Sequence, residues 1–128
     1  MANTKLTKEA LAKALKELLL ERPLDKISVK DITEHCGMSR NNFYYHFQDK
    51  YELISWIFYN DISKRVETYA DSSKFLEDSF TSVCECLYNE REFYLKCFKY
   101  VEQNSLFDVL TELYMELWTK TLRERYAN

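Results

Sequence analysis

The sequence predicts an all-α fold, and three observations carry this prediction. The chain of 128 residues contains one Gly and one Pro, where average usage gives roughly nine and six. The segments between them are long and free of helix breakers. Apolar residues make up 46% of the chain and charged residues 30%, so the chain can bury a core and disorder is disfavoured. We expect one core, or two small subdomains that share one.

Composition also excludes several function classes. Walker-type and Rossmann-type phosphate loops need at least two glycines, and Gly37 is the single glycine. Two His residues and the lack of a nucleophile–base spacing argue against an enzyme, and no cofactor is expected. No apolar run approaches the roughly 18 to 20 residues that cross a bilayer, and the start lacks a signal-peptide pattern. We therefore expect a cytoplasmic protein with no membrane contact.

The first predicted helix begins at Thr7 as its N-cap and stops before Pro23. Its apolar residues repeat with helical spacing, so one face is expected to enter the core. That face consists of Leu11, Ala14, Leu15, Leu18 and Leu19.

A short second helix is predicted over about residues 29–35. Ser28 and Asp31 have the spacing of a capping box at its start. Gly37 stands where a left-handed residue ends a helix, and Ser39 can cap a third helix two residues later. The pattern predicts a helix, a tight turn and another helix.

The third helix is predicted from Ser39 to about Phe47. Phe43 and Phe47 lie one turn apart and define its buried side, so Asn41 and Tyr45 point away from them at about 100° per residue. The flanks carry Asn42, Tyr44 and His46. This outer face is aromatic and polar and contains no acid.

A long fourth helix is predicted from a capping pattern at residues 49–52 to about Ala70. Three more helices are expected within residues 71–89, 90–101 and 105–126, which makes about seven in total. In the last of them, Ser105 and Asp108 have capping-box spacing. One face of that helix carries a stripe of Leu106, Leu110, Leu113 and Leu117. We predict a helix-turn-helix domain over residues 1–49 and a helical bundle over residues 50–128.

The net charge of −3 is unevenly distributed. Residues 1–50 carry 9 Lys and Arg against 7 Asp and Glu, whereas residues 51–128 carry 9 against 14. The N-terminal part is therefore mildly basic. Together with three short helices and a Gly-containing turn, this favours major-groove DNA binding. The spacing alone leaves an ordinary three-helix bundle open.

The residues then carry a family resemblance. Residues 27–32 (ISVKDI) and 36–53 (CGMSRNNFYYHFQDKYEL) resemble the DNA-binding signature of tetracycline-repressor-type (TetR/AcrR) transcriptional regulators. The later run at residues 90–118 is similar to the C-terminal domain of a Firmicutes branch that includes dihydroxyacetone-kinase regulators.

The resemblance implies a role for several side chains. Ser28 and Lys50 would hold phosphates, and Arg40 and Asn41 would read bases. The groove would also contain Ser39 and Asn42, while the side chains that brace the recognition helix against the DNA backbone would be Tyr44, Tyr45 and His46. Asn41 and Asn42 depart from common family forms, so base specificity does not carry over.

The resemblance further implies a homodimer on a two-fold DNA operator and an effector at the C-terminal domain, either a small molecule or a kinase-like protein. Regulators of this type run to about nine helices, so 128 residues indicate a short or truncated member. An aromatic effector pocket is expected from Trp56, Tyr59, Phe80, Tyr94, Phe98 and Tyr114, although an ordinary core explains the same residues. The sequence does not distinguish a repressor from an activator.

The four cysteines are interpreted as reduced thiols. Cys84 and Cys86 lie about 200° apart on a helix, so they cannot chelate zinc together and no metal site is expected. Cys97 could approach either of them as a thiol switch. The alternative to a DNA-binding regulator is an all-helical adaptor that binds another protein and makes no DNA contact.

Overall fold

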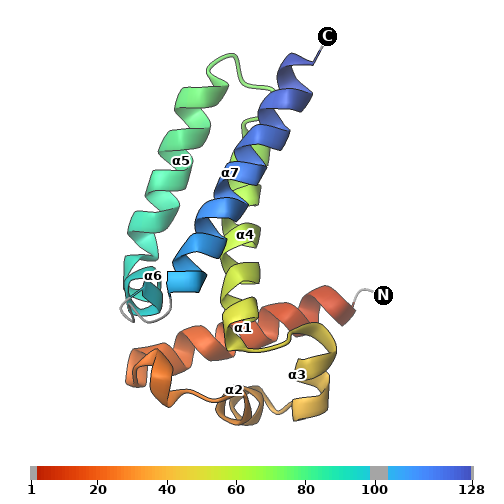
Figure 1. Cartoon of the computed structure of the whole chain (residues 1–128), viewed down its shortest axis with the longest axis vertical. Coiled ribbons are helices and arrows are strands. Elements are labelled where there is room, and N and C mark those ends of the chain that lie inside the picture. The colour runs from red at the N-terminus through yellow and green to blue at the C-terminus, as the bar shows by residue number, and fades with distance from the viewer. Residues whose placement is uncertain (1–2, 99–103, 128) are drawn as a thin grey trace. The chain divides into compact units, whose positions relative to one another are not determined.

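The computed structural model describes residues 3–98 and 104–127, without the side chains of residues 3, 104–107 and 110. Over these residues the chain is all-α with seven α-helices, as predicted, and it also contains one 3₁₀ helix (Figure 1). The elements are α1 (Asn3–Glu21), η1 (Leu24–Lys26), α2 (Val29–Cys36), α3 (Arg40–His46), α4 (Lys50–Thr68), α5 (Phe75–Asn89), α6 (Arg91–Phe98) and α7 (Asn104–Tyr126).

The chain divides into two compact units, Met1–Ile54 and Ser55–Asn128. The first unit contains α1, η1, α2, α3 and the first turn of α4, and the second contains the rest of α4 with α5, α6 and α7. None of the helices in the described ranges is long and apolar enough to span a membrane.

The start of α1 differs from the prediction. The helix begins at Asn3, so Thr7 lies inside it and is not its N-cap. Residues 4–6 contain no Gly or Pro, and Lys5 and Leu6 favour helix, so the helix continues one turn further toward the N-terminus. Leu6 is exposed, and no tertiary packing is needed to explain this extra turn.

The core of the first unit is built from the predicted leucine face of α1. All five of its residues are buried: Leu11, Ala14, Leu15, Leu18 and Leu19. Ile32 from α2 and Phe43 from α3 have no exposed surface, so both short helices are fixed by burial. The 3₁₀ helix η1 was not predicted; it follows Pro23 and buries Leu24.

In the second unit, α4, α5 and α7 run alongside one another (Figure 1). Tyr94 of α6 packs edge-on against Phe58 of α4, with ring centroids 5.8 Å apart. Phe75 of α5 packs on Trp118 of α7 at 5.7 Å. Arg125 near the end of α7 donates to the backbone carbonyls of the α4–α5 connection and lies over the Phe75 ring. This guanidinium therefore ties the end of α7 to the start of α5.

Helix α5 is apolar on two sides. One side is buried and includes Phe75, Val83 and Cys86. The other side is exposed and carries an apolar stripe at intervals of four residues, made of Leu76, Phe80, Cys84 and Tyr88. In α7, Leu117 of the predicted stripe is buried and Leu113 is half-buried, whereas the side chains of Ser105, Leu106 and Leu110 lie outside the described residues.

Candidate nucleic-acid interface

The turn between α2 and α3 is set by Gly37. Its φ is 71°, in the left-handed region, which a residue with a Cβ adopts only at a cost. Its N–H donates to the Glu34 carbonyl at 3.3 Å, and the next N–H, that of Met38, donates to the Thr33 carbonyl at 2.8 Å. Two carbonyls of the last turn of α2 are thus satisfied, and α3 begins at Arg40.

The start of α2 carries the predicted capping box. The Asp31 N–H donates to Ser28 Oγ at 3.1 Å, and the Ser28 N–H donates to Asp31 Oδ2 at 2.9 Å. Arg22 at the end of α1 lies 3.4 Å from the same carboxylate. Ser28 is exposed, and its hydroxyl hydrogen remains able to donate, because Oγ serves here as the acceptor.

Ser39 fixes the start of α3. Its Oγ accepts the Asn42 N–H at 3.1 Å, which satisfies one of the N–H groups that open a helix. Arg40 and Asn41 in the first turn are exposed, and Asn42 is half-buried. The cap therefore fixes the start of the helix, and the two predicted base-reading residues lie at the surface of its first turn.

The predicted faces of α3 are confirmed. Phe43 is fully buried and Phe47 is 3% exposed, whereas Tyr45 is 83% exposed and Tyr44 53% exposed. The Tyr45 ring packs edge-on against half-buried His46, with centroids 5.0 Å apart. The two phenylalanines anchor the helix, and the tyrosines form an exposed surface without a carboxylate.

Lys50, the first residue of α4, forms hydrogen bonds within the N-terminal unit. Its Nζ donates to the backbone carbonyls of Leu24 at 2.8 Å and Ile27 at 2.7 Å. The side chain is half-buried, and burial lowers the pKa of its ammonium while the carboxylates of Asp25 and Asp31 oppose that shift. The resemblance implied a phosphate contact for this residue, and the structure gives its ammonium two internal acceptors.

His35 joins α2 to α1. Its Nε2 lies 3.0 Å from Glu17 Oε1. The four cysteines form no disulfide with one another. Cys84 is exposed and Cys86 buried, which confirms that they lie on opposite sides of α5. No three His, Cys, Asp or Glu side chains within the described part of the chain are grouped so that they could hold a metal ion.

The six residues of the predicted effector pocket differ in exposure and in their aromatic neighbours. Tyr94 and Phe98 stack with centroids 6.4 Å apart, and Tyr114 packs on Trp118 at 6.1 Å. Trp56 is half-buried. Tyr59 and Phe80 are exposed by 36% and 57%. Helical spacing identifies the aromatic positions but does not report the distances between residues of different helices.

A polar cleft in the second unit was not predicted from sequence. It has a volume of about 210 Å³ and is lined by Asp61, Lys64, Arg65, Cys86, Asn89 and Glu90. The Asp61 carboxylate accepts the Tyr94 hydroxyl at 3.1 Å, and Arg65 Nη1 donates to Ser82 Oγ at 3.4 Å. In the sequence, Asp61 and Arg65 lie one helical turn apart, and this spacing was the available sign of a polar cleft beside α4.

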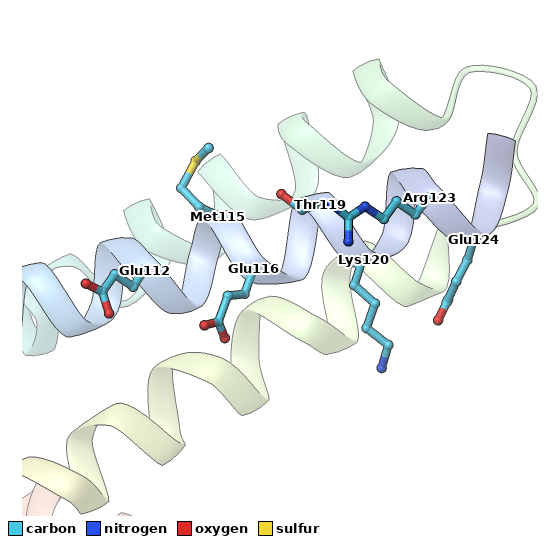
Figure 2. Close-up of a pocket in the computed structure, with 7 residues that line it drawn as sticks. All are labelled: Glu112, Met115, Glu116, Thr119, Lys120, Arg123 and Glu124. Carbon is cyan, nitrogen blue, oxygen red and sulfur yellow. The ribbon is translucent and has the colours of Figure 1, made fainter. Parts of the chain in front are cut away.

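A second depression, of about 560 Å³, follows the outer surface of α7. Figure 2 shows that all the residues lining it belong to this one helix: Glu112, Met115, Glu116, Thr119, Lys120, Arg123 and Glu124. Five of the seven carry a charge, so this surface has the composition of a solvated helix face.

Comparisons with known proteins agree with the predicted family. Residues 10–55 match the family described as bacterial regulatory proteins, tetR family. The chain is 37% identical over 71 residues to the HTH-type dhaKLM operon transcriptional activator DhaS of Lactococcus lactis subsp. lactis (strain IL1403). That match spans 56% of this chain and 38% of the relative.

A solved structure, that of the dihydroxyacetone kinase operon activator DhaS, is similar with a TM-score of 0.59 and 29% identity. The similarity covers 89% of this chain and 67% of that one. The region matched by the family contains α2, the Gly37 turn, α3 and the start of α4. This N-terminal region is therefore similar to the tetR family of bacterial regulatory proteins.

Proposed function

We propose that the protein is a sequence-specific DNA-binding transcriptional regulator. The observation that carries this proposal is the exposed surface of α3, where Arg40, Asn41, Tyr44 and Tyr45 are all exposed and no acid interrupts them. An amide, a guanidinium and two phenols can donate to base edges and phosphates. Gly37 ends α2 in the left-handed conformation and α3 begins three residues later, a connection of the length found in helix-turn-helix motifs.

Within this proposal, Arg40 and Asn41 read bases, because they are exposed in the first turn of the recognition helix. The remaining contacts go to the DNA backbone and carry no sequence information. They come from Ser28, Tyr44, Tyr45 and His46, while Ser39 and Asn42 lie in the groove beside Arg40 and Asn41.

A two-fold operator requires two copies of the recognition helix. We propose that the protein binds as a homodimer, with half-sites about one helical turn, roughly 34 to 36 Å, apart. The expected footprint is a pseudo-palindrome with two protected major-groove segments on one side of the duplex.

The second unit is proposed to bind an effector that changes DNA affinity, either a small molecule or a kinase-like protein partner. The polar cleft of about 210 Å³, lined by both cations and carboxylates, supports a small polar ligand. One relative is named as an activator of the dhaKLM operon and the other as an activator of a dihydroxyacetone kinase operon, so dihydroxyacetone is the first compound to test. Movement of α4 on binding would change the separation of the two recognition helices.

Salt dependence of binding to the promoter of the protein's own gene tests the DNA-binding proposal. Affinity should fall steeply between about 50 and 200 mM salt if several phosphates are neutralised. Tyr45→Ala should weaken binding to all sequences, whereas Arg40→Ala should change sequence preference. Lys120→Ala on α7 removes an exposed charge and serves as the matched control.

The alternative is an all-helical adaptor that binds another protein. It would show DNA binding that is absent or indifferent to salt, and neither Tyr45→Ala nor Arg40→Ala would differ from the parent. The effector proposal has its own test. It fails if the protein binds DNA and none of the metabolites added changes its DNA affinity.

A further inference from the structure

The polar cleft of the second unit carries charges of both signs. Among its lining residues, Lys64 and Arg65 are cations, and Asp61 and Glu90 are carboxylates. The formal charges of these four side chains sum to zero. A ligand with a single charge would be attracted to one pair and repelled by the other.

The two carboxylates belong to the end of the cleft beside α6. Asp61 Oδ2 accepts the hydroxyl of Tyr94, a residue of α6, at 3.1 Å. Glu90 directly precedes α6, and its backbone carbonyl accepts the Tyr94 N–H at 3.1 Å. Both acidic residues are half-buried and both are bonded to the same tyrosine. The end of the cleft at the start of α6 is therefore negative.

The cations belong to the other end of the cleft. Arg65 follows Asp61 by one turn of α4, and its Nη1 donates to Oγ of Ser82, in the middle of α5, at 3.4 Å. Ser82 precedes Glu90 by eight residues, which is about 12 Å along a helix axis. Lys64 neighbours Arg65 in the chain and is exposed. The cleft is thus polarised along α4, with its positive end toward the middle of α5.

The Arg65 guanidinium offers further donors to a ligand. It has five N–H groups, and the bond to Ser82 uses one of them at 3.4 Å, which is longer than the usual range of about 2.7 to 3.2 Å. The side chain is half-buried, so its donors are partly removed from water. A carboxylate can accept two of these N–H groups in parallel.

We propose that this cleft binds a small zwitterion of the α-amino acid class. The carboxylate of the ligand accepts from Arg65, with Lys64 adding positive charge, and its ammonium donates to Asp61 and Glu90. This inference rests on the proposed effector function of the second unit and names the chemical class of the effector.

The volume of the cleft sets the size of the ligand. Its 210 Å³ is about seven times the roughly 30 Å³ that one water molecule occupies in the liquid. A ligand of about seven non-hydrogen atoms therefore fits, which is the size of L-serine. Ethanolamine lacks the carboxylate of L-serine, and 3-hydroxypropionate lacks its ammonium, so these three compounds are the probes.

The test measures binding of each probe to the full chain by calorimetry, without DNA. L-Serine should bind. Ethanolamine and 3-hydroxypropionate should each bind at least about tenfold more weakly, because each lacks one set of charge-assisted hydrogen bonds.

Two variants assign each charge of the ligand to its end of the cleft. Arg65→Gln removes the cation but keeps an amide that can donate to Ser82, and it should reduce the difference between L-serine and ethanolamine to about twofold. Asp61→Asn keeps an acceptor for the Tyr94 hydroxyl, and it should reduce the difference between L-serine and 3-hydroxypropionate in the same way. Lys120→Gln on α7 is the control and should leave both differences unchanged.

Three results with the folded parent would overturn the proposal. One is the absence of L-serine binding at about 10 mM, well above a millimolar dissociation constant. Another is binding of 3-hydroxypropionate as tight as that of L-serine, which would indicate an anion site. The third is binding of ethanolamine as tight as that of L-serine, which would indicate a cation site.

A second measurement locates the ligand and does not depend on the folding of any variant. In NMR spectra of the parent, the backbone amide shifts caused by L-serine should be largest around Asn89 and Glu90. Shifts that are largest around Lys120 and Arg123 would place the ligand on the outer surface of α7 and would contradict the assignment.

Failure of this inference can be told apart from failure of the effector function. If L-serine binds with the expected pattern and leaves DNA affinity unchanged, the effector function fails and the zwitterion site stands. If L-serine does not bind and another metabolite changes DNA affinity, the zwitterion site fails and the effector function stands.

Discussion

Ser28 and Asp31 cap α2 reciprocally, each donating its backbone N–H to the side chain of the other at 2.9 and 3.1 Å. These hydrogen bonds hold the pKa of the Asp31 carboxyl below its ordinary value of 3.8. The backbone N–H of Ser28 is the largest cause, followed by the Ser28 side chain. The start of α2 is therefore sensitive to acid.

Stability should reflect this shift. A carboxyl whose pKa is lowered by folding contributes stability above its unfolded-state pKa and loses that contribution as the pH falls through the folded-state value. We expect the parent to lose stability as the pH falls below about 4, and Asp31→Asn to lose less over the same interval. Ser28→Ala keeps the backbone donor and should be intermediate. Urea unfolding at a series of pH values measures this, and equal acid sensitivity of parent and Asp31→Asn would contradict it.

The Gly37 turn should be sensitive to backbone geometry and indifferent to side-chain volume. A Cβ at this position would meet no atom within 4 Å, so the cost of Gly37→Ala is that of the positive φ, about 1–2 kcal/mol. Gly37→Asn should cost less, since Asn adopts the left-handed conformation more readily. Chemical denaturation gives both values. Equal losses of unfolding free energy in Gly37→Ala and Gly37→Asn would show that the positive φ does not determine the cost of the substitution.

The two faces of α3 should separate stability from DNA binding. Phe43→Ala removes a fully buried ring and should lower the free energy of unfolding by about 3–5 kcal/mol. Tyr45→Ala removes an exposed ring and should change stability by less than about 0.5 kcal/mol while weakening DNA binding. Thermal melts and binding titrations on the same samples test the pair. A large stability loss in Tyr45→Ala would mean that its ring packs on the domain.

Local signals explain which features could be predicted from sequence. Ser28, Gly37 and Ser39 act on residues within three or four positions of themselves, so their roles follow from spacing. The faces of α3 follow in the same way from Phe43 and Phe47. The predicted start of α1 at Thr7 is wrong because a favourable N-cap residue does not end a helix when the residues before it also favour helix.

Features that depend on distant partners could not be predicted from spacing. The acceptors of Lys50 lie 23 and 26 residues away, and the tyrosine that donates to Asp61 lies 33 residues away. On α5, apolar residues occupy both sides of the helix, so Phe80 and Phe75 are equally good core candidates in sequence. Only packing shows that Phe75 is 1% exposed and Phe80 57% exposed.

The hydrogen bond from Tyr94 to Asp61 should control stability at high pH. Tyr94 is 4% exposed, and burial, followed by the nearby Asp61 carboxylate, raises the pKa of its phenol far above the ordinary value of 10. A raised pKa means that the neutral phenol stabilises the fold below the unfolded-state pKa, and that this stability is lost as the pH rises through the folded-state value.

We expect Tyr94→Phe to be less stable than the parent by about 1–3 kcal/mol at neutral pH, because the Asp61 carboxylate loses its buried donor. Above about pH 10 the parent should lose stability. A phenylalanine side chain cannot ionise, so the difference in free energy of unfolding between the parent and Tyr94→Phe should become smaller. Tyr88→Phe, at an exposed tyrosine, is the control and should follow the parent at every pH. Urea unfolding across the alkaline range measures all three, and a constant difference between parent and Tyr94→Phe would show that the phenol is not held neutral by the fold.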